Sequence, residues 1–261
     1  MKKQRTWKGY VLATYLTFWM MVLVLCGGAS MIFHAPPVVM RLLSNLCAWS
    51  PTIVLLLMLP RLRPGQTVCG FLKESFSGAI RPGLLLLSAG LTLGAFGIAV
   101  VVTDCWTGMK YTSAWPVLAS VLFSLTSGPT GEECGWRGYL RPELEKRYGF
   151  LHGAVVVGLV WAFWHAVLWA VDNDFTSGGA LAIYIVANVV VLIALNIIMS
   201  VVLERENNLL YAMLIHLCFN LPYCFLAPSI EFYIVLTFAF SLAAAVALLV
   251  RKRWVPNVYV K

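Results

Sequence analysis

Apolar runs of about twenty residues recur along almost the whole chain, and they restrict it to one class of fold. Hydrophobic residues make up 61% of the 261 residues and charged residues only 11%, whereas charged residues make up about a quarter of a soluble domain. A helical run of this length matches the thickness of a bilayer. The sequence therefore predicts an all-α, polytopic membrane helix bundle, with residues 1–261 as a single integral membrane domain.

Eight of these runs are interpreted as transmembrane helices. The second is the least regular, because Arg41, Asn45 and Pro51 interrupt it. The predicted spans cover residues 10–32, 37–59, 82–102, 114–135, 150–171, 179–202, 208–226 and 229–250. An even number of crossings would leave both ends of the chain on the same side of the membrane.

Lys and Arg are distributed unevenly between the two sides that these spans define. Placing the N-terminus in the cytoplasm puts 16 of the 19 Lys and Arg residues on that side, with Arg41 and Lys110 outside and Arg137 in the membrane. Cytoplasmic loops carry such an excess. The pattern predicts a multi-pass protein of the plasma membrane with both termini cytoplasmic. The net charge of +8 lies in short loops, so no nucleic-acid partner is expected.

Glu132, Glu133 and Arg137 lie within six residues of one another at the end of the fourth run. A charged side chain at the bilayer centre costs about 2.5 to 3.5 kcal/mol, so a function is the better explanation, and a charge cluster at the membrane interface is the alternative. On a helix, Glu133 and Arg137 are four apart and can pair, while Glu132 points about 100° away. The spacing predicts one paired and one free carboxylate.

Gly128 and Pro129 come directly before these glutamates. Such residues bend a membrane helix and free backbone groups, which is tolerated where protein or a water-filled cavity satisfies them. We therefore expect a kink and a cavity beside the paired carboxylates.

His165 lies in the fifth run at a position that can be related to Glu132. The two are 33 residues apart, and their midpoint falls at a predicted turn around Tyr148 and Gly149. In an antiparallel helical hairpin, residues equidistant from the turn lie at the same depth. Glu132 and His165 are therefore predicted to face each other, although a lone core histidine is the alternative.

His216 and Asn220 in the seventh run are also four residues apart and therefore lie on one helical face. Two polar side chains on one stripe of an apolar helix are predicted to point inward, toward the same cavity. Asn196 of the sixth run is interpreted as a residue that makes hydrogen bonds between helices.

Together these motifs resemble those of the CPBP intramembrane protease family. They are the EExxxR of Glu132, Glu133 and Arg137, the (F/W)xxxH that ends at His165, and the HxxxN of His216 and Asn220. The second motif is usually FxxxH, and here Trp161 stands first. The resemblance covers about residues 115–225, the predicted catalytic core, and the first three spans carry no motif. The family includes type II CAAX prenyl endopeptidases and Abi-type proteins linked to bacteriocin maturation or immunity.

The resemblance implies an intramembrane endopeptidase that hydrolyses a peptide bond with an activated water molecule. In that mechanism Glu132 would be the base and His165 its partner. His216 and Asn220 would bind the oxyanion, and Glu133 and Arg137 would be a supporting ion pair. One Glu and two His are also a legitimate zinc set. A glutamate-type mechanism and a metal-dependent mechanism, the latter with Glu132, His165 and His216 as ligands, therefore both stay open.

Two other functions are compatible with the same residues. A non-catalytic immunity or scaffold protein would bind a peptide or partner without cleaving it. A proton-coupled transporter would use the intramembrane Glu and His as a relay, but no internal repeat supports that function. The expected partners of the endopeptidase are membrane lipid and a membrane-associated, prenylated or precursor peptide.

Overall fold

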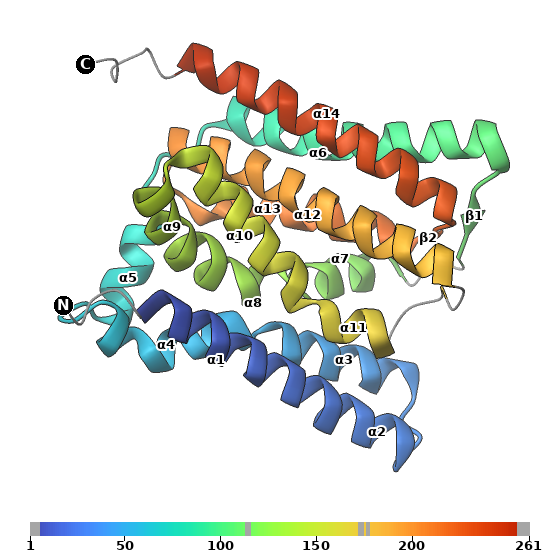
Figure 1. Cartoon of the computed structure of the whole chain (residues 1–261), viewed down its shortest axis with the longest axis horizontal. Helices are drawn as coiled ribbons and strands as arrows, with labels where there is room; N and C mark the ends of the chain where they lie inside the picture. Colours follow the sequence, from blue (N-terminus) through green and yellow to red (C-terminus); the bar gives the residue numbers. More distant parts are fainter. Residues whose placement is uncertain (1–5, 113–115, 172–174, 176–177, 255–261) are drawn as a thin grey trace.

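A computed structural model describes residues 6–112, 116–171, 175 and 178–254. In this part the chain is almost entirely helical, and the long helices run roughly along one common direction (Figure 1). The all-α membrane bundle predicted from the apolar runs is confirmed.

Six helical segments of the described residues are long and apolar enough to cross a membrane. The first contains a π-helical turn, η1, and the second is interrupted at Trp49. The segments are α1, η1 and α2 (Thr6–Met21, Val22–Cys26 and Gly27–Met31), α3 and α4 (Pro37–Ala48 and Ser50–Leu62), α6 (Pro82–Thr107), α10 and α11 (Phe150–Trp164 and Ala166–Val171), α12 (Gly178–Arg205) and α14 (Ile230–Trp254). Six of the eight predicted spans therefore have a full-length counterpart.

The other two predicted spans, 114–135 and 208–226, are built from shorter helices, and residues 114 and 115 lie outside the described part. The shorter elements are α7 (Val117–Thr126), α8 (Pro129–Glu133), the π-helix η2 (Cys134–Leu140), α13 (Leu209–Asn220) and the 3₁₀ turn η3 (Leu221–Cys224). The interruption expected at Gly128 and Pro129 is confirmed, because α7 ends just before them and α8 begins at Pro129.

Most residues of α8, η2 and α13 are buried, whereas α7 is partly exposed along most of its length. Figure 1 shows α6 and α14 together on one outer face and α1 to α4 on the opposite face, with α10, α12 and α13 between them. Helix α12 packs against α10, α13 and α14, and most of its residues between 191 and 203 are buried. The elements that carry the three motifs are therefore enclosed by the other spans.

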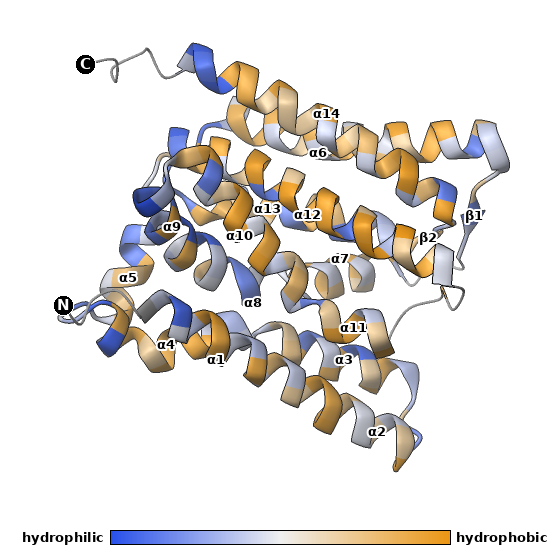
Figure 2. Ribbon diagram, viewed as in Figure 1, coloured by the Kyte–Doolittle hydropathy of each residue, from blue (hydrophilic) through white to orange (hydrophobic). Residues whose placement is uncertain are grey.

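The two ends of the bundle differ in character. One end carries α5 (Val68–Ser75) and α9 (Arg141–Tyr148), and it is markedly hydrophilic (Figure 2). The other end carries an antiparallel pair of short strands, β1 (Lys110–Tyr111) and β2 (Leu226–Ala227).

Helix α1 begins and α14 ends at the hydrophilic end (Figure 1). This arrangement agrees with an even number of crossings. The terminal residues themselves, 1–5 and 255–261, lie outside the described part, and a cytoplasmic location for both termini stays a prediction.

Two native thiols can test the predicted orientation. Cys69 on α5 and Cys105 near the end of α6 are both exposed, at opposite ends of the bundle. If the end with α5 is cytoplasmic, as the distribution of Lys and Arg predicts, a membrane-impermeant maleimide added to intact cells should label Cys105 and should reach Cys69 only after permeabilisation. Peptide mapping by mass spectrometry, with Cys69→Ser and Cys105→Ser as controls, identifies the labelled thiol. Labelling of Cys69 alone in intact cells would reverse the orientation.

Candidate active site

The two glutamates of the first motif lie on α8, directly after the helix break at Gly128. Asn45 Nδ2 donates a hydrogen bond to Thr126 Oγ1 at 2.8 Å, and Trp49 Nε1 donates to the Thr126 carbonyl oxygen at 3.1 Å. Carbonyl groups at a helix end inside a membrane need such donors. The second span thus stabilises the break that positions the glutamates.

A buried ion pair follows the glutamates. Glu133 Oε1 lies 3.1 Å from Arg137 Nη1, and the same oxygen lies 2.6 Å from His216 Nδ1. Arg137 Nε donates to Asn196 Oδ1 at 3.0 Å, and Asn196 Nδ2 donates to the Ala154 carbonyl at 2.6 Å. Glu133 and Arg137 are 0% and 1% exposed. The predicted pairing of Glu133 with Arg137 and the interhelical role of Asn196 are both confirmed.

Glu132 forms no ion pair with any described residue. Its Oε2 accepts a hydrogen bond from Trp161 Nε1 at 2.5 Å. Its Oε1 faces Gly128, because a Cβ atom added there would lie 3.0 Å from this oxygen and 2.6 Å from His216 Nε2. The free carboxylate and the second ring nitrogen of His216 therefore face the same place beside Gly128, and a side chain at residue 128 would collide with both.

His165 ends α10 in the middle of the fifth span. Its Nδ1 lies 2.8 Å from the carbonyl oxygen of Trp161. A carbonyl only accepts, so Nδ1 carries the hydrogen and Nε2 keeps a free lone pair. Among the described residues no hydrogen bond joins His165 to Glu132. Trp161, one helical turn before His165, bonds to both, so α10 contacts α8 through this residue. That Glu132 and His165 lie at the same depth stays a prediction.

The end of α10 is capped by the first span. Tyr15 donates its hydroxyl hydrogen to the Val160 carbonyl at 2.5 Å, and Trp19 Nε1 donates to the Trp164 carbonyl at 2.9 Å. These carbonyls lie in the last turn of a helix that stops inside the membrane, where water cannot satisfy them. Sequence reasoning missed this support, since no motif marks the first span.

Asn220 is the last residue of α13, one helical turn beyond His216, and η3 follows it. Its Nδ2 lies 3.5 Å from Ser127 Oγ, and the side chain is half-buried. His216 and Asn220 therefore both turn toward the break between α7 and α8, as their spacing predicts. Each of the three motifs lies at or beside an interruption of a membrane helix.

Glu132, His165 and His216, the possible zinc ligands, are not gathered around one point in the structure. Within the described residues no group of three or more His, Cys, Asp or Glu is arranged to hold a metal ion. Hydrogen bonds to Trp161 and Glu133 occupy Glu132 Oε2 and the Nδ1 atoms of both histidines, so Glu132 Oε1 and the two Nε2 atoms would be the ligands of a metal ion. In the arrangement of the described residues these atoms are not gathered closely enough to hold zinc.

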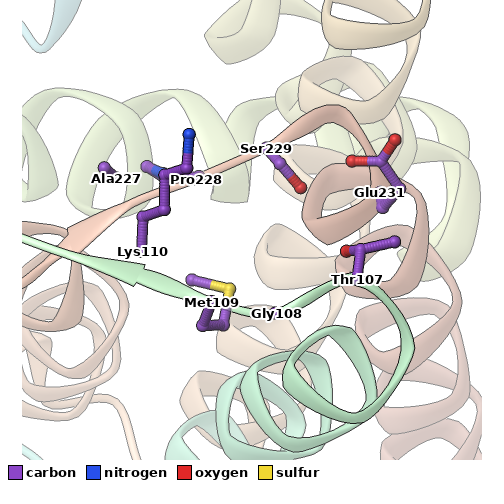
Figure 3. Close-up of a pocket in the computed structure, with 8 residues that line it drawn as sticks. All are labelled: Thr107, Gly108, Met109, Lys110, Ala227, Pro228, Ser229 and Glu231. Atoms are coloured by element: carbon purple, nitrogen blue, oxygen red, sulfur yellow. The ribbon is translucent and has the colours of Figure 1, made fainter.

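A cavity of about 240 Å³ lies away from this site, at the end of the bundle that carries β1 and β2 (Figure 3). Its charged residues are Lys110 and Glu231, which Figure 3 shows on different sides of it. None of the residues that line it belongs to a motif. It is therefore separate from the candidate active site.

Comparison with known proteins agrees with the motifs. Residues 112–222 match a family model described as type II CAAX prenyl endopeptidase Rce1-like. The chain is 27% identical to CAAX prenyl protease 2 of Methanococcus maripaludis over 184 aligned residues. The aligned region covers 67% of this chain and 64% of the relative. The match thus spans slightly less than two thirds of the relative's length. The motifs, their arrangement and these matches together support the similarity of this chain to the CPBP family, which includes the Rce1-like type II CAAX prenyl endopeptidases.

Proposed function

We propose that this protein is an intramembrane endopeptidase that hydrolyses a peptide bond of a membrane-associated substrate. The observation that carries the proposal is that Glu132 Oε1 and His216 Nε2 face the same place beside Gly128. The two atoms are close enough to each other that one water or carbonyl oxygen held between them would be within hydrogen-bonding distance of both. A free carboxylate and an imidazole around one such position suit the hydrolysis of a peptide bond.

In the proposed reaction Glu132 is the general base. Its Oε1 removes a proton from water while the water oxygen attacks the carbonyl carbon of the scissile bond. The lone pair on His165 Nε2 accepts the other hydrogen of the water and orients it. The tetrahedral intermediate then collapses, the C–N bond breaks, and the proton on Glu132 passes to the leaving amine. Glu132 returns to its carboxylate form.

His216 and Asn220 are proposed to stabilise the oxyanion. When the His216 ring carries both protons, Nδ1–H stays on Glu133 Oε1 and Nε2–H points to the place beside Gly128. The Asn220 amide has a second hydrogen besides the one directed at Ser127. A donor of this kind contributes about 100-fold to 1000-fold to the rate of an acyl-transfer reaction.

Glu133 and Arg137 are proposed as the supporting pair. The carboxylate of Glu133 holds the His216 ring through Nδ1, and Arg137 neutralises that carboxylate. Asn196 fixes the far side of the guanidinium to α10 through the Ala154 carbonyl. The pair thus sets the direction in which His216 Nε2 points.

The substrate is proposed to be a peptide at or within the bilayer, because the site lies among membrane-spanning helices. The Methanococcus maripaludis relative is named a CAAX prenyl protease, and by this similarity a peptide with a prenylated end is one class of substrate. A precursor peptide, such as a bacteriocin leader, is the other. The catalytic core is proposed to be residues 115–225, in a multi-pass protein of the plasma membrane.

Replacement of Glu132 by Gln tests the base. The change keeps the shape of the side chain, so we expect cleavage to fall roughly 100-fold to 10,000-fold while expression and Tm stay close to wild type. Purified protein would be incubated with prenylated and unmodified membrane peptides and the products identified by mass spectrometry. If Glu132→Gln cleaved like wild type while Glu133→Gln was stable but inactive, the roles of base and support would have to be exchanged.

Gly128→Ala tests the position of the reacting water. The added methyl group would lie within 3.0 Å of both Glu132 and His216, so it would occupy or distort the place that both face, and we expect a loss of cleavage of about 100-fold. Gly90→Ala on α6 is the matched control, since its Cβ would meet no atom within 4 Å. Full activity of Gly128→Ala, with a Tm like that of the control, would place the reaction elsewhere.

Removal of one partner of the Glu133–Arg137 pair should destabilise the protein. Either Glu133→Gln or Arg137→Leu leaves a charge unpaired in the core, and we expect a cost of about 3 to 5 kcal/mol, seen as a lower Tm in detergent. The double variant should recover part of this loss. Glu204→Gln is the control, because the Glu204–Arg251 pair is about 30% exposed and should contribute about 0 to 1 kcal/mol. A double variant no more stable than Arg137→Leu would argue against the pair.

A further inference from the structure

Trp161 contacts most of the motif side chains, although none of the catalytic steps above uses it. It is 1% exposed. Its contacts are the hydrogen bond from Nε1 to Glu132 Oε2 (2.5 Å), the bond that its carbonyl accepts from His165 Nδ1 (2.8 Å), the Arg137 guanidinium 3.8 Å above its ring, and an edge-to-face contact with His216 (5.2 Å between ring centroids). A residue in this position is able to control how the motif residues are arranged.

The indole N–H determines which oxygen of Glu132 is free. The terminal torsion of a glutamate side chain is broad and has no sharp rotamer wells, so an unheld carboxylate can rotate. With Oε2 engaged by Trp161, Oε1 is the oxygen that faces the place beside Gly128. A hydrogen bond from a neutral donor also leaves the carboxylate charge in place, which a base requires.

The ring of Trp161 also covers one face of the Arg137 guanidinium, the cation with which Glu132 would otherwise pair. Arg137 Nη2 has no hydrogen-bond partner among the described residues, and a freed Glu132 could turn toward it. The guanidinium instead lies over the indole ring, in a cation–π contact, while Nη1 stays on Glu133. Glu132 is therefore held by the edge of the indole ring, and Arg137 is held by its face.

We propose that Trp161 is a positioning residue whose indole N–H holds Glu132 Oε2, so that Oε1 is presented to the reacting water and Glu132 is kept out of an ion pair with Arg137. The inference rests on the proposed function, since it assigns Glu132 as the base. In the proposed mechanism Trp161 acts on Glu132 and does not touch the substrate, so its loss should lower kcat and leave KM unchanged.

Trp161→Phe removes the N–H and keeps an aromatic ring. We expect kcat to fall about 10-fold to 100-fold, the effect of losing one hydrogen bond to a charged group, with little change in KM. Trp136→Phe is the matched control: Trp136 is 0% exposed, packs edge to face against Tyr10 and Trp164, and its Nε1 has no hydrogen-bond partner in the described residues. The control should keep the wild-type kcat.

A second readout does not depend on activity. In protein labelled with ¹⁵N-tryptophan, the indole resonance that disappears in Trp161→Phe should change its chemical shift in Glu132→Gln. The resonance that disappears in Trp136→Phe should stay unchanged in Glu132→Gln. If Trp161→Phe does not fold, site-specific replacement of Trp161 by benzothienylalanine, which has the shape of tryptophan and no N–H, gives the same kinetic comparison.

The outcomes separate this inference from the proposed function. If Glu132→Gln is inactive while the Trp161 variant keeps the wild-type kcat, the positioning role is wrong and the endopeptidase stands. If wild-type protein cleaves none of the peptides, or Glu132→Gln is as active as wild type, the proposed function fails. In that case the indole resonance decides whether Trp161 holds Glu132, and a resonance unaffected by Glu132→Gln overturns that claim too.

Discussion

A helix can be interrupted inside a membrane only where other groups satisfy its freed backbone, and this constraint governs the whole site. The fourth and fifth spans both break in the interior, at Gly128 and at His165. Asn45 and Trp49 donate hydrogen bonds at the first break, and two aromatic side chains of α1 donate at the second. The N-terminal spans carry no motif, yet they stabilise the broken ends from which the motif residues project.

The buried charges are arranged so that one carboxylate stays free. Glu133 is shared between Arg137 and His216, and the face of the Trp161 ring covers the guanidinium. The cation is therefore engaged by the supporting residues, and Glu132 receives only a neutral donor. In the proposed mechanism the two neighbouring glutamates therefore have different roles: Glu133 forms a stable buried ion pair, and Glu132 stays free to act as a base. Two glutamates in equivalent surroundings could not fill both roles.

Helical periodicity was sufficient to predict those parts of the site that depend on one element. The four-residue spacing of Glu133 and Arg137 predicted their ion pair, and the spacing of His216 and Asn220 predicted their common face. The break at His165 was not foreseen, because no Gly or Pro marks it. The π-helix η2 and the bond from Trp161 to Glu132 depend on how separate helices pack, and a single sequence carries no pattern for side-chain directions across helices.

The central claim is that the free carboxylate of Glu132 activates water for the cleavage of a membrane peptide. The most direct measurement is a comparison of the membrane and secreted peptidomes of cells that express the wild-type protein or Glu132→Gln at equal levels. If the claim is correct, a set of peptides with a common cleavage pattern is present only with the wild-type protein, and their uncut precursors accumulate with Glu132→Gln. Identical peptidomes at equal expression would contradict it and would favour a protein that binds its partner without cleaving it.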